Sequence, residues 1–144
     1  MMLYLLLILC FLFFPNISFN NINYTPNFLI ILLLFSVYKF EKHIFLIIAF
    51  LIGFIIDVLT QFSLFGINMI SFTVFGYFYI LIYEIKNETF KNLLILSLIF
   101  LFNLVQFSIS ETNSLLVIFF ISLINLISTL FTYIIISKFF LRKK

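Results

Sequence analysis

The chain has few of the residues that carry chemistry or that make a surface compatible with water. Among its 144 residues there are one cysteine, one histidine, three glycines, two prolines and no tryptophan. The single cysteine, Cys10, excludes an internal disulfide, a CxxC redox pair and a thiolate metal site. Charged residues make up 9% of the chain, against about 25% in a typical soluble domain. This scarcity of charge excludes a soluble globular protein.

Apolar residues dominate what remains. Hydrophobic residues make up 65% of the chain, and the mean hydropathy is +1.34. A chain this short cannot hide so many apolar groups in one core, because much of its surface stays exposed, so the surrounding medium must be lipid. At about 20 residues per helical crossing, the length allows at most about six crossings and no soluble domain. We therefore predict an all-α integral membrane protein with a single transmembrane domain over residues 1–144.

Six apolar stretches are expected to form the transmembrane helices. They cover residues 1–14, 26–38, 44–60, 67–83, 93–109 and 115–137. The first has the length of a signal-peptide core, but no basic residue precedes it and no small-residue cleavage site follows, so we interpret it as a span. The second would cover only about 20 Å of a core of about 30 Å, which leaves open whether it fully crosses. Thr25 and Pro26 are a favourable start for that helix.

The basic residues predict the orientation in the membrane. The breaks at 39–43 and 84–92 carry two lysines each, and the tail after the last span carries the other four basic residues. The breaks at 15–25, 61–66 and 110–114 carry none, so every basic residue falls on one side, which the positive-inside rule identifies as cytoplasmic. Both termini are therefore predicted to be cytoplasmic. These residues could also contact anionic lipid or cytoplasmic partners, whereas their positions at span edges speak against nucleic-acid binding.

Asp57 is the one charged residue inside a predicted span. An aspartate at a helix centre costs about 2.5 to 3.5 kcal/mol on insertion scales, so it needs a partner. Gly53 lies one turn earlier on the same face and would let another helix approach closely. Asn68, Asn103 and Gln106 reach a similar depth, so we predict a polar cluster of Asp57 with these three amides. The cluster could be structural hydrogen bonding between helices, or a site for partner binding or switching.

The sixth span carries a second polar pattern. Ser122, Asn125, Thr129 and Thr132 follow one another at spacings of three and four, which puts them on one helical face. We expect this stripe to pack against other helices, together with Gly76 among the small residues of the fourth span.

The residue types that catalysis requires are missing from the spans. An intramembrane aspartyl protease needs two carboxylates that share a site, and here only Asp57 is available. Serine hydrolysis needs a nearby base, and His43 lies at the cytoplasmic edge. No HExxH pattern or Gly-rich phosphate loop is present. We predict a protein that is not an enzyme, with no catalytic residues, no metal site and no cofactor.

The segment GFIIDVLTQFSLFGINMISFTVFGYF, residues 53–78, resembles the rod shape-determining protein MreD family. That family has a glycine followed four residues later by an aspartate near a helix end, which Gly53 and Asp57 match. A short turn ending in leucine and glycine follows, which Leu64, Gly66 and Asn68 approximate. Residues 60–62 depart from the family pattern, because they lack the glycine that often follows the aspartate. The length, the six-span layout and the basic tail also fit.

The resemblance implies a non-enzymatic component of the bacterial cell-elongation machinery in the cytoplasmic membrane. Its expected partners are an MreC-like bitopic membrane protein, MreB filaments, and the peptidoglycan synthase RodA with its penicillin-binding protein. Helix faces packed by Gly53, Gly66 and Gly76 would dock the MreC-like helix, and Asp57 would order the outer turn. The implied fold is similar to the substrate-binding subunits of energy-coupling-factor transporters. A vitamin-type binding subunit of such a transporter is therefore the alternative, since fold alone does not decide function.

Overall fold

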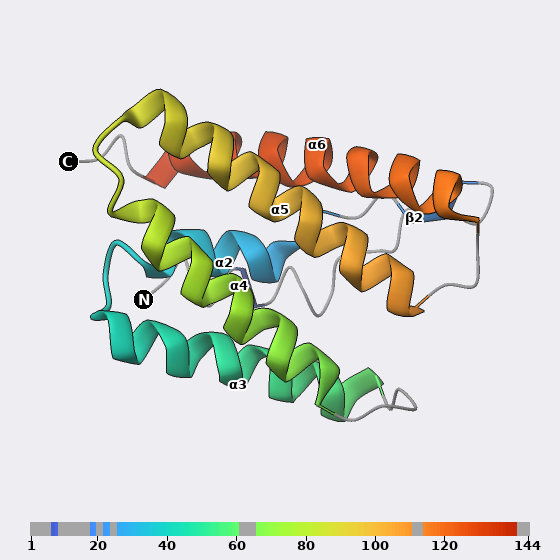
Figure 1. Cartoon of the computed structure of the whole chain (residues 1–144), viewed down its shortest axis with the longest axis horizontal. Coiled ribbons are helices and arrows are strands. Elements are labelled where there is room, and N and C mark those ends of the chain that lie inside the picture. Colours follow the sequence, from blue (N-terminus) through green and yellow to red (C-terminus); the bar gives the residue numbers. More distant parts are fainter. Residues whose placement is uncertain are drawn as a thin grey trace. The chain divides into compact units, whose positions relative to one another are not determined.

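The computed structural model describes residues 7–8, 18–19, 22–23, 26–60, 66–110 and 114–140. Within these ranges five helices are complete: α2 (Phe28–Ser36), α3 (Lys42–Thr60), α4 (Ile67–Tyr83), α5 (Glu88–Ser110) and α6 (Leu115–Phe140) (Figure 1). Two short strands, β1 (Ser18–Phe19) and β2 (Ile22–Asn23), pair antiparallel with Ser18 opposite Asn23. The predicted all-α class is confirmed for the described residues apart from this short ladder, which the sequence did not indicate.

The last five predicted spans each correspond to one helix. Three of these helices contain stretches long and apolar enough to cross a membrane: Lys42–Leu59, Glu88–Ser108 and Leu115–Lys138. The helix α4 is also apolar but shorter, and α2 has only nine residues. The predicted first span lies outside the described residues except for Leu7 and Ile8, which are helical. The count of six crossings therefore stays a prediction.

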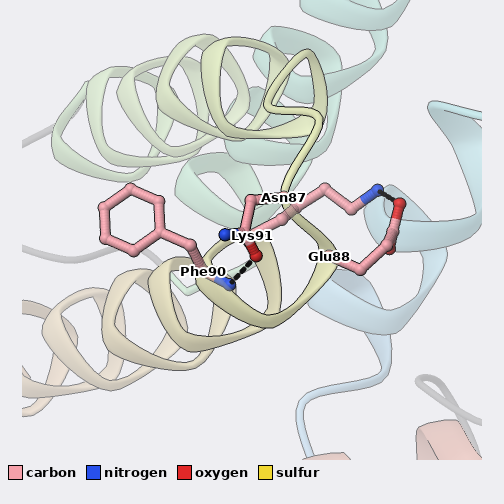
Figure 2. Close-up of polar contacts among 4 residues, drawn as sticks. All are labelled: Asn87, Glu88, Phe90 and Lys91. Atoms are coloured by element: carbon pink, nitrogen blue, oxygen red, sulfur yellow. Dashed lines mark hydrogen bonds and ion pairs between the residues drawn. The ribbon is translucent and has the colours of Figure 1, made fainter.

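Asparagine side chains cap the N-termini of two helices. The Asn87 Oδ1 accepts a hydrogen bond of 3.2 Å from the Phe90 N–H at the start of α5, beside a Lys91–Glu88 ion pair of 2.6 Å (Figure 2). In the same way, the Asn27 Oδ1 accepts a 3.2 Å bond from the Ile30 N–H and caps α2. Because Asn27 takes the capping position, the helix begins at Phe28, two residues later than a start at Pro26 would place it.

The chain divides into two compact units. Unit 1 combines Met1–Leu32 with Ile99–Lys144, and unit 2 is Leu33–Leu98. Unit 2 contains α3 and α4, which lie side by side and antiparallel as a helical hairpin (Figure 1). Unit 1 contains α6, with the strand β2 beside it.

Small residues let the two helices of the hairpin approach closely. A Cβ atom added at Gly76 of α4 would meet the Ala49 Cβ of α3 at 3.1 Å and the Phe45 ring at 3.3 Å. The core of the hairpin next to this contact is aromatic, because the buried Tyr79 packs on Phe45 and Phe75. The buried Tyr79 hydroxyl is not left unpaired, since it donates to the carbonyl of Leu34 at 3.4 Å.

Candidate functional site: a carboxylate cap between two helices

Asp57 caps the start of α4 from the end of α3. Asp57 is 3% exposed, and both carboxylate oxygens accept hydrogen bonds. The Oδ1 atom accepts from the backbone N–H of Asn68 at 3.2 Å and from its side-chain amide at 2.9 Å. The Oδ2 atom accepts from the N–H groups of Gly66 at 3.1 Å and Met69 at 3.0 Å. Three of these donors are backbone groups at the start of α4, where a helix leaves its N–H groups without internal partners.

The local sequence explains why α4 needs a cap from another helix. Gly66 occupies the N-cap position with φ of 102°, a conformation that glycine adopts without strain, but it has no side chain to accept a bond. Asp57 supplies the missing acceptor. The N-terminus of a helix carries a partial positive charge, which stabilises a carboxylate placed there. Four donors and this dipole together offset the cost of holding a carboxylate away from water.

Gly53 makes the cap possible by bringing the two backbones into contact. A Cβ atom at this position would lie 2.5 Å from the Asn68 carbonyl oxygen and 2.5 Å from the Met69 Cα. No side chain can occupy that space unless the backbone of α4 moves. Gly53 and Asp57, one helical turn apart, therefore act together on the same residues of α4.

An ion pair joins the two helices at the other end of the hairpin, where neighbouring segments also contact α4. Lys42 at the start of α3 forms an ion pair with Glu84, which ends α4. The Lys91 ammonium lies 5.5 Å from the centre of the Tyr83 ring, which also contacts Tyr38 edge to face. The Lys42–Glu84 pair is exposed and contributes little free energy, but it shows that the start of α3 lies beside the end of α4.

The structure brings part of the predicted polar cluster together. Asp57, Gly53, Gly66 and Asn68 meet where α3 ends and α4 begins. Asn103 and Gln106 lie on α5 in unit 1, so their place in a shared cluster stays a prediction. The Asn103 Nδ2 and Gln106 Nε2 atoms are buried, and no described residue accepts a hydrogen bond from them.

Thr129 of the predicted stripe on α6 bonds to Asn27, the residue directly before α2. Ser122, Asn125 and Thr129 are buried, while Thr132 is partly exposed. The Thr129 hydroxyl accepts from the Asn27 N–H at 3.0 Å and lies 3.3 Å from the Asn125 Oδ1, to which it donates. The hydroxyls of Ser122 and Thr132 donate to carbonyls of their own helix.

Sequence reasoning missed the part that Asn27 plays in this contact. An asparagine directly before an apolar run is a recognised helix-start signal, and applying it here would have found the cap on α2. The backbone bond from Asn27 to Thr129 had no such signal, because any residue except proline can supply an N–H donor.

The geometry of Asp57 suits the positioning of helices. Both carboxylate oxygens are occupied by N–H donors from one helix start, and the described residues contain no group of three His, Cys, Asp or Glu side chains that could hold a metal ion. The hydrogen bonds of Asp57 therefore hold the end of α3 against the start of α4.

These features define a helical membrane protein in which a buried carboxylate joins two neighbouring helices. The family model of the rod shape-determining protein MreD matches residues 1–143, and the chain belongs to this family. The resemblance read from residues 53–78 is thus confirmed over essentially the whole chain, and it places the protein in rod shape determination. No curated protein and no solved structure matches the chain, so the likeness to energy-coupling-factor subunits stays a prediction.

Proposed function

We propose that the protein is a non-enzymatic scaffold of the cell-elongation machinery, which docks the single membrane helix of an MreC-like partner. Membership of the MreD family supports a role in cell shape. The hairpin of α3 and α4 supports a scaffold, because it is joined at both ends and its one buried carboxylate is fully used in joining it. MreB filaments and the RodA synthase complex would be reached directly or through the bitopic partner.

We place the docking face on the exposed side of α4. Atoms of the other hairpin helix occupy the space beside Gly53 and Gly76, so a partner helix cannot pack against these glycines. Ile70, Val74, Tyr77 and Leu81 follow one another at spacings of four, three and four, and each is at least 46% exposed. This spacing forms a continuous seam along a helix, of the kind that packs against a second helix. We call these four residues the α4 seam.

Tyr77 is the observation that carries this proposal. It lies seven residues before Glu84, about 10 Å from the polar end of the hairpin along the helix. Side chains lean toward the N-terminus of their helix, so the Tyr77 hydroxyl is directed away from that polar end and into the membrane. The phenol is 53% exposed, and no described residue bonds to its hydroxyl. A partner helix with a hydrogen-bond acceptor at this depth would satisfy it.

Co-purification with the MreC-like partner tests the docking face. Tyr77→Phe removes the hydroxyl alone, and interhelical hydrogen bonds contribute about 0.6 kcal/mol on average and up to about 1.7 kcal/mol. We therefore expect the affinity for the partner to fall about threefold, and at most about 18-fold. Tyr38→Phe is the matched control, because it removes an exposed phenol hydroxyl from the polar end of the hairpin and should leave affinity unchanged.

A second variant tests the apolar part of the α4 seam. Ile70→Ala shortens a side chain that is 66% exposed and contributes nothing to the core of the hairpin. We expect weaker co-purification and wider, rounder cells, whereas Ile47→Ala on the exposed side of α3 should change neither. Wild-type partner binding by both Tyr77→Phe and Ile70→Ala would show that the partner docks elsewhere.

A further inference from the structure

We propose that the second span is discontinuous, and that water reaches its break near the middle of the membrane from the outer side. Only α2 is helical in this part of the described chain, and its nine residues cover about 13 Å. That length is less than half of a hydrocarbon core of about 30 Å. Pro26 and Asn27, directly before α2, are not helical, so this helix does not cross the membrane by itself.

The contact with α6 gives the depth of the break. The Asn27 N–H, directly before α2, donates to the Thr129 Oγ1 at 3.0 Å. Thr129 lies about 21 Å along α6 from Leu115 and about 13 Å before Lys138, at the rise of an α-helix. Lys138 is the charged residue that ends the apolar stretch of α6, so it marks the membrane boundary. The helix α2 therefore starts close to the middle of the bilayer.

Exposure at this depth points to water. The apolar residues Phe28 to Phe35 are all buried, whereas Pro26 and Asn27 are partly exposed. Polar groups and backbone outside a helix are tolerated at membrane depth only where protein covers them or water reaches them. Its N–H, carbonyl and Oδ1 are paired, but no described residue accepts from its side-chain amide. Because Asn27 is partly exposed, covering by this chain is incomplete, and contact with lipid would leave that amide without a partner.

Two more hydrogen-bond donors in unit 1 lack an acceptor among the described residues. The amide nitrogens of Asn103 and Gln106 are buried, and no described residue accepts from them. Buried amides without protein acceptors are usually satisfied by ordered water. These amides are an independent sign that the interior of unit 1 is hydrated.

The direction of entry follows from α2 itself. From Asn27 the chain continues as a buried apolar helix toward Lys39, on the side predicted to be cytoplasmic, and this helix leaves no polar path. Water therefore enters from the opposite side, where residues 15–25 are predicted to lie.

Cysteine accessibility tests this proposal in the membrane. In a Cys10→Ser background, Asn27→Cys and Pro26→Cys are treated in spheroplasts with a membrane-impermeant maleimide, which reacts with the thiolate that forms only in water. Ile127→Cys is the matched control, because Ile127 is 64% exposed and lies on α6 within two residues of Thr129. Ser114→Cys, before the first residue of α6, reports full accessibility. Asn27→Cys keeps the backbone N–H that bonds Thr129, and Pro26→Cys leaves the cap intact.

We expect the thiols at 26 and 27 to react within about tenfold of the rate at 114, and the thiol at 127 to react about a hundredfold more slowly. Labelling at 26 and 27 as slow as at 127 would overturn the hydrated break. Rapid labelling from the cytoplasmic side alone would overturn the outer entry. None of these outcomes depends on partner docking, so the proposal can fail while the scaffold function holds.

Discussion

At the scale of single residues, Asp57 is the position where a substitution should cost most stability. Asp57→Ala leaves the donors of Gly66, Asn68 and Met69 without their acceptor at a buried helix start. Loss of an N-cap costs about 0.5 to 2 kcal/mol, and loss of a charged hydrogen-bond acceptor costs about 1.5 to 3 kcal/mol. We expect the free energy of unfolding in detergent to fall by about 2 to 4 kcal/mol, measured by denaturant titration.

Ser97→Ala provides the control for that measurement. The exposed Ser97 hydroxyl donates only to the Leu94 carbonyl of its own helix, so the change should stay within about 0.5 kcal/mol. If Asp57→Ala unfolds at the same denaturant concentration as the wild type, the carboxylate does not hold the hairpin together.

The three glycines should differ in their response to alanine. Gly53→Ala places a Cβ atom 2.5 Å from backbone atoms of α4, so the helices must separate, at a cost of about 1 to 3 kcal/mol. Gly66→Ala has open space around it but puts a side chain at φ of 102°, which costs about 1 to 2 kcal/mol. Gly76→Ala meets the Ala49 Cβ at 3.1 Å and the Phe45 ring at 3.3 Å, so the helices must separate only slightly. The gain of about 1 kcal/mol in helix propensity offsets part of that cost.

Melting temperatures of these three variants in detergent give the comparison. We expect Gly53→Ala to melt lowest and Gly76→Ala to melt closest to the wild type. A Gly76→Ala protein less stable than Gly53→Ala would contradict the close backbone contact at Gly53.

At the scale of elements, the Thr129 hydroxyl joins α6 to Asn27, the residue directly before α2. Thr129→Val keeps the shape of the side chain but removes the acceptor for the Asn27 N–H. Asn27 is partly exposed, so water can replace the lost acceptor, and the unfolding free energy should fall only by the net contribution of a hydrogen bond, about 0.5 to 1.5 kcal/mol. Thr132→Val is the matched control, since its hydroxyl donates only to the Ser128 carbonyl within α6. Equal stability of the two variants would show that the link contributes nothing.

The elements differ in how well the sequence predicts them. Hydropathy predicts α4 and the start of α6 at the observed residues, because polar residues interrupt the apolar runs there. It misplaces the start of α2, since an apolar run does not reveal which residue caps it. Asp57 is found because a charge in lipid needs a partner, but most of its partners are backbone N–H groups, which have no side-chain signature. Equal depth along a span likewise does not fix which helices are neighbours, so the place of Asn103 beside Asp57 stays a prediction.

At the scale of the whole molecule, the hairpin implies that α3 and α4 cross the membrane together. The helix α3 is long enough to cross a membrane, and contacts join its start to the end of α4 and its end to the start of α4. The 17-residue α4 therefore runs antiparallel to α3 along nearly its whole length. Once α3 crosses, α4 must cross as well, and the same reasoning places Lys42 and Glu84 on one side of the membrane.

Reporter fusions test this arrangement and the predicted orientation together. Alkaline phosphatase is active only outside the cytoplasm, so a fusion after Ser114 should be active, whereas fusions after Glu41 and after Lys86 should be inactive. A fluorescent protein that folds only in the cytoplasm should give the opposite pattern at the same three positions. The basic residues set this expectation, because lysines flank the fusion sites after Glu41 and Lys86 while residues 110–114 carry none.

An active phosphatase after Lys86 with an inactive one after Glu41 would mean that α3 and α4 do not cross as a pair. Activity after both would invert the whole topology, and it would move the entry of water at Asn27 to the cytoplasmic side.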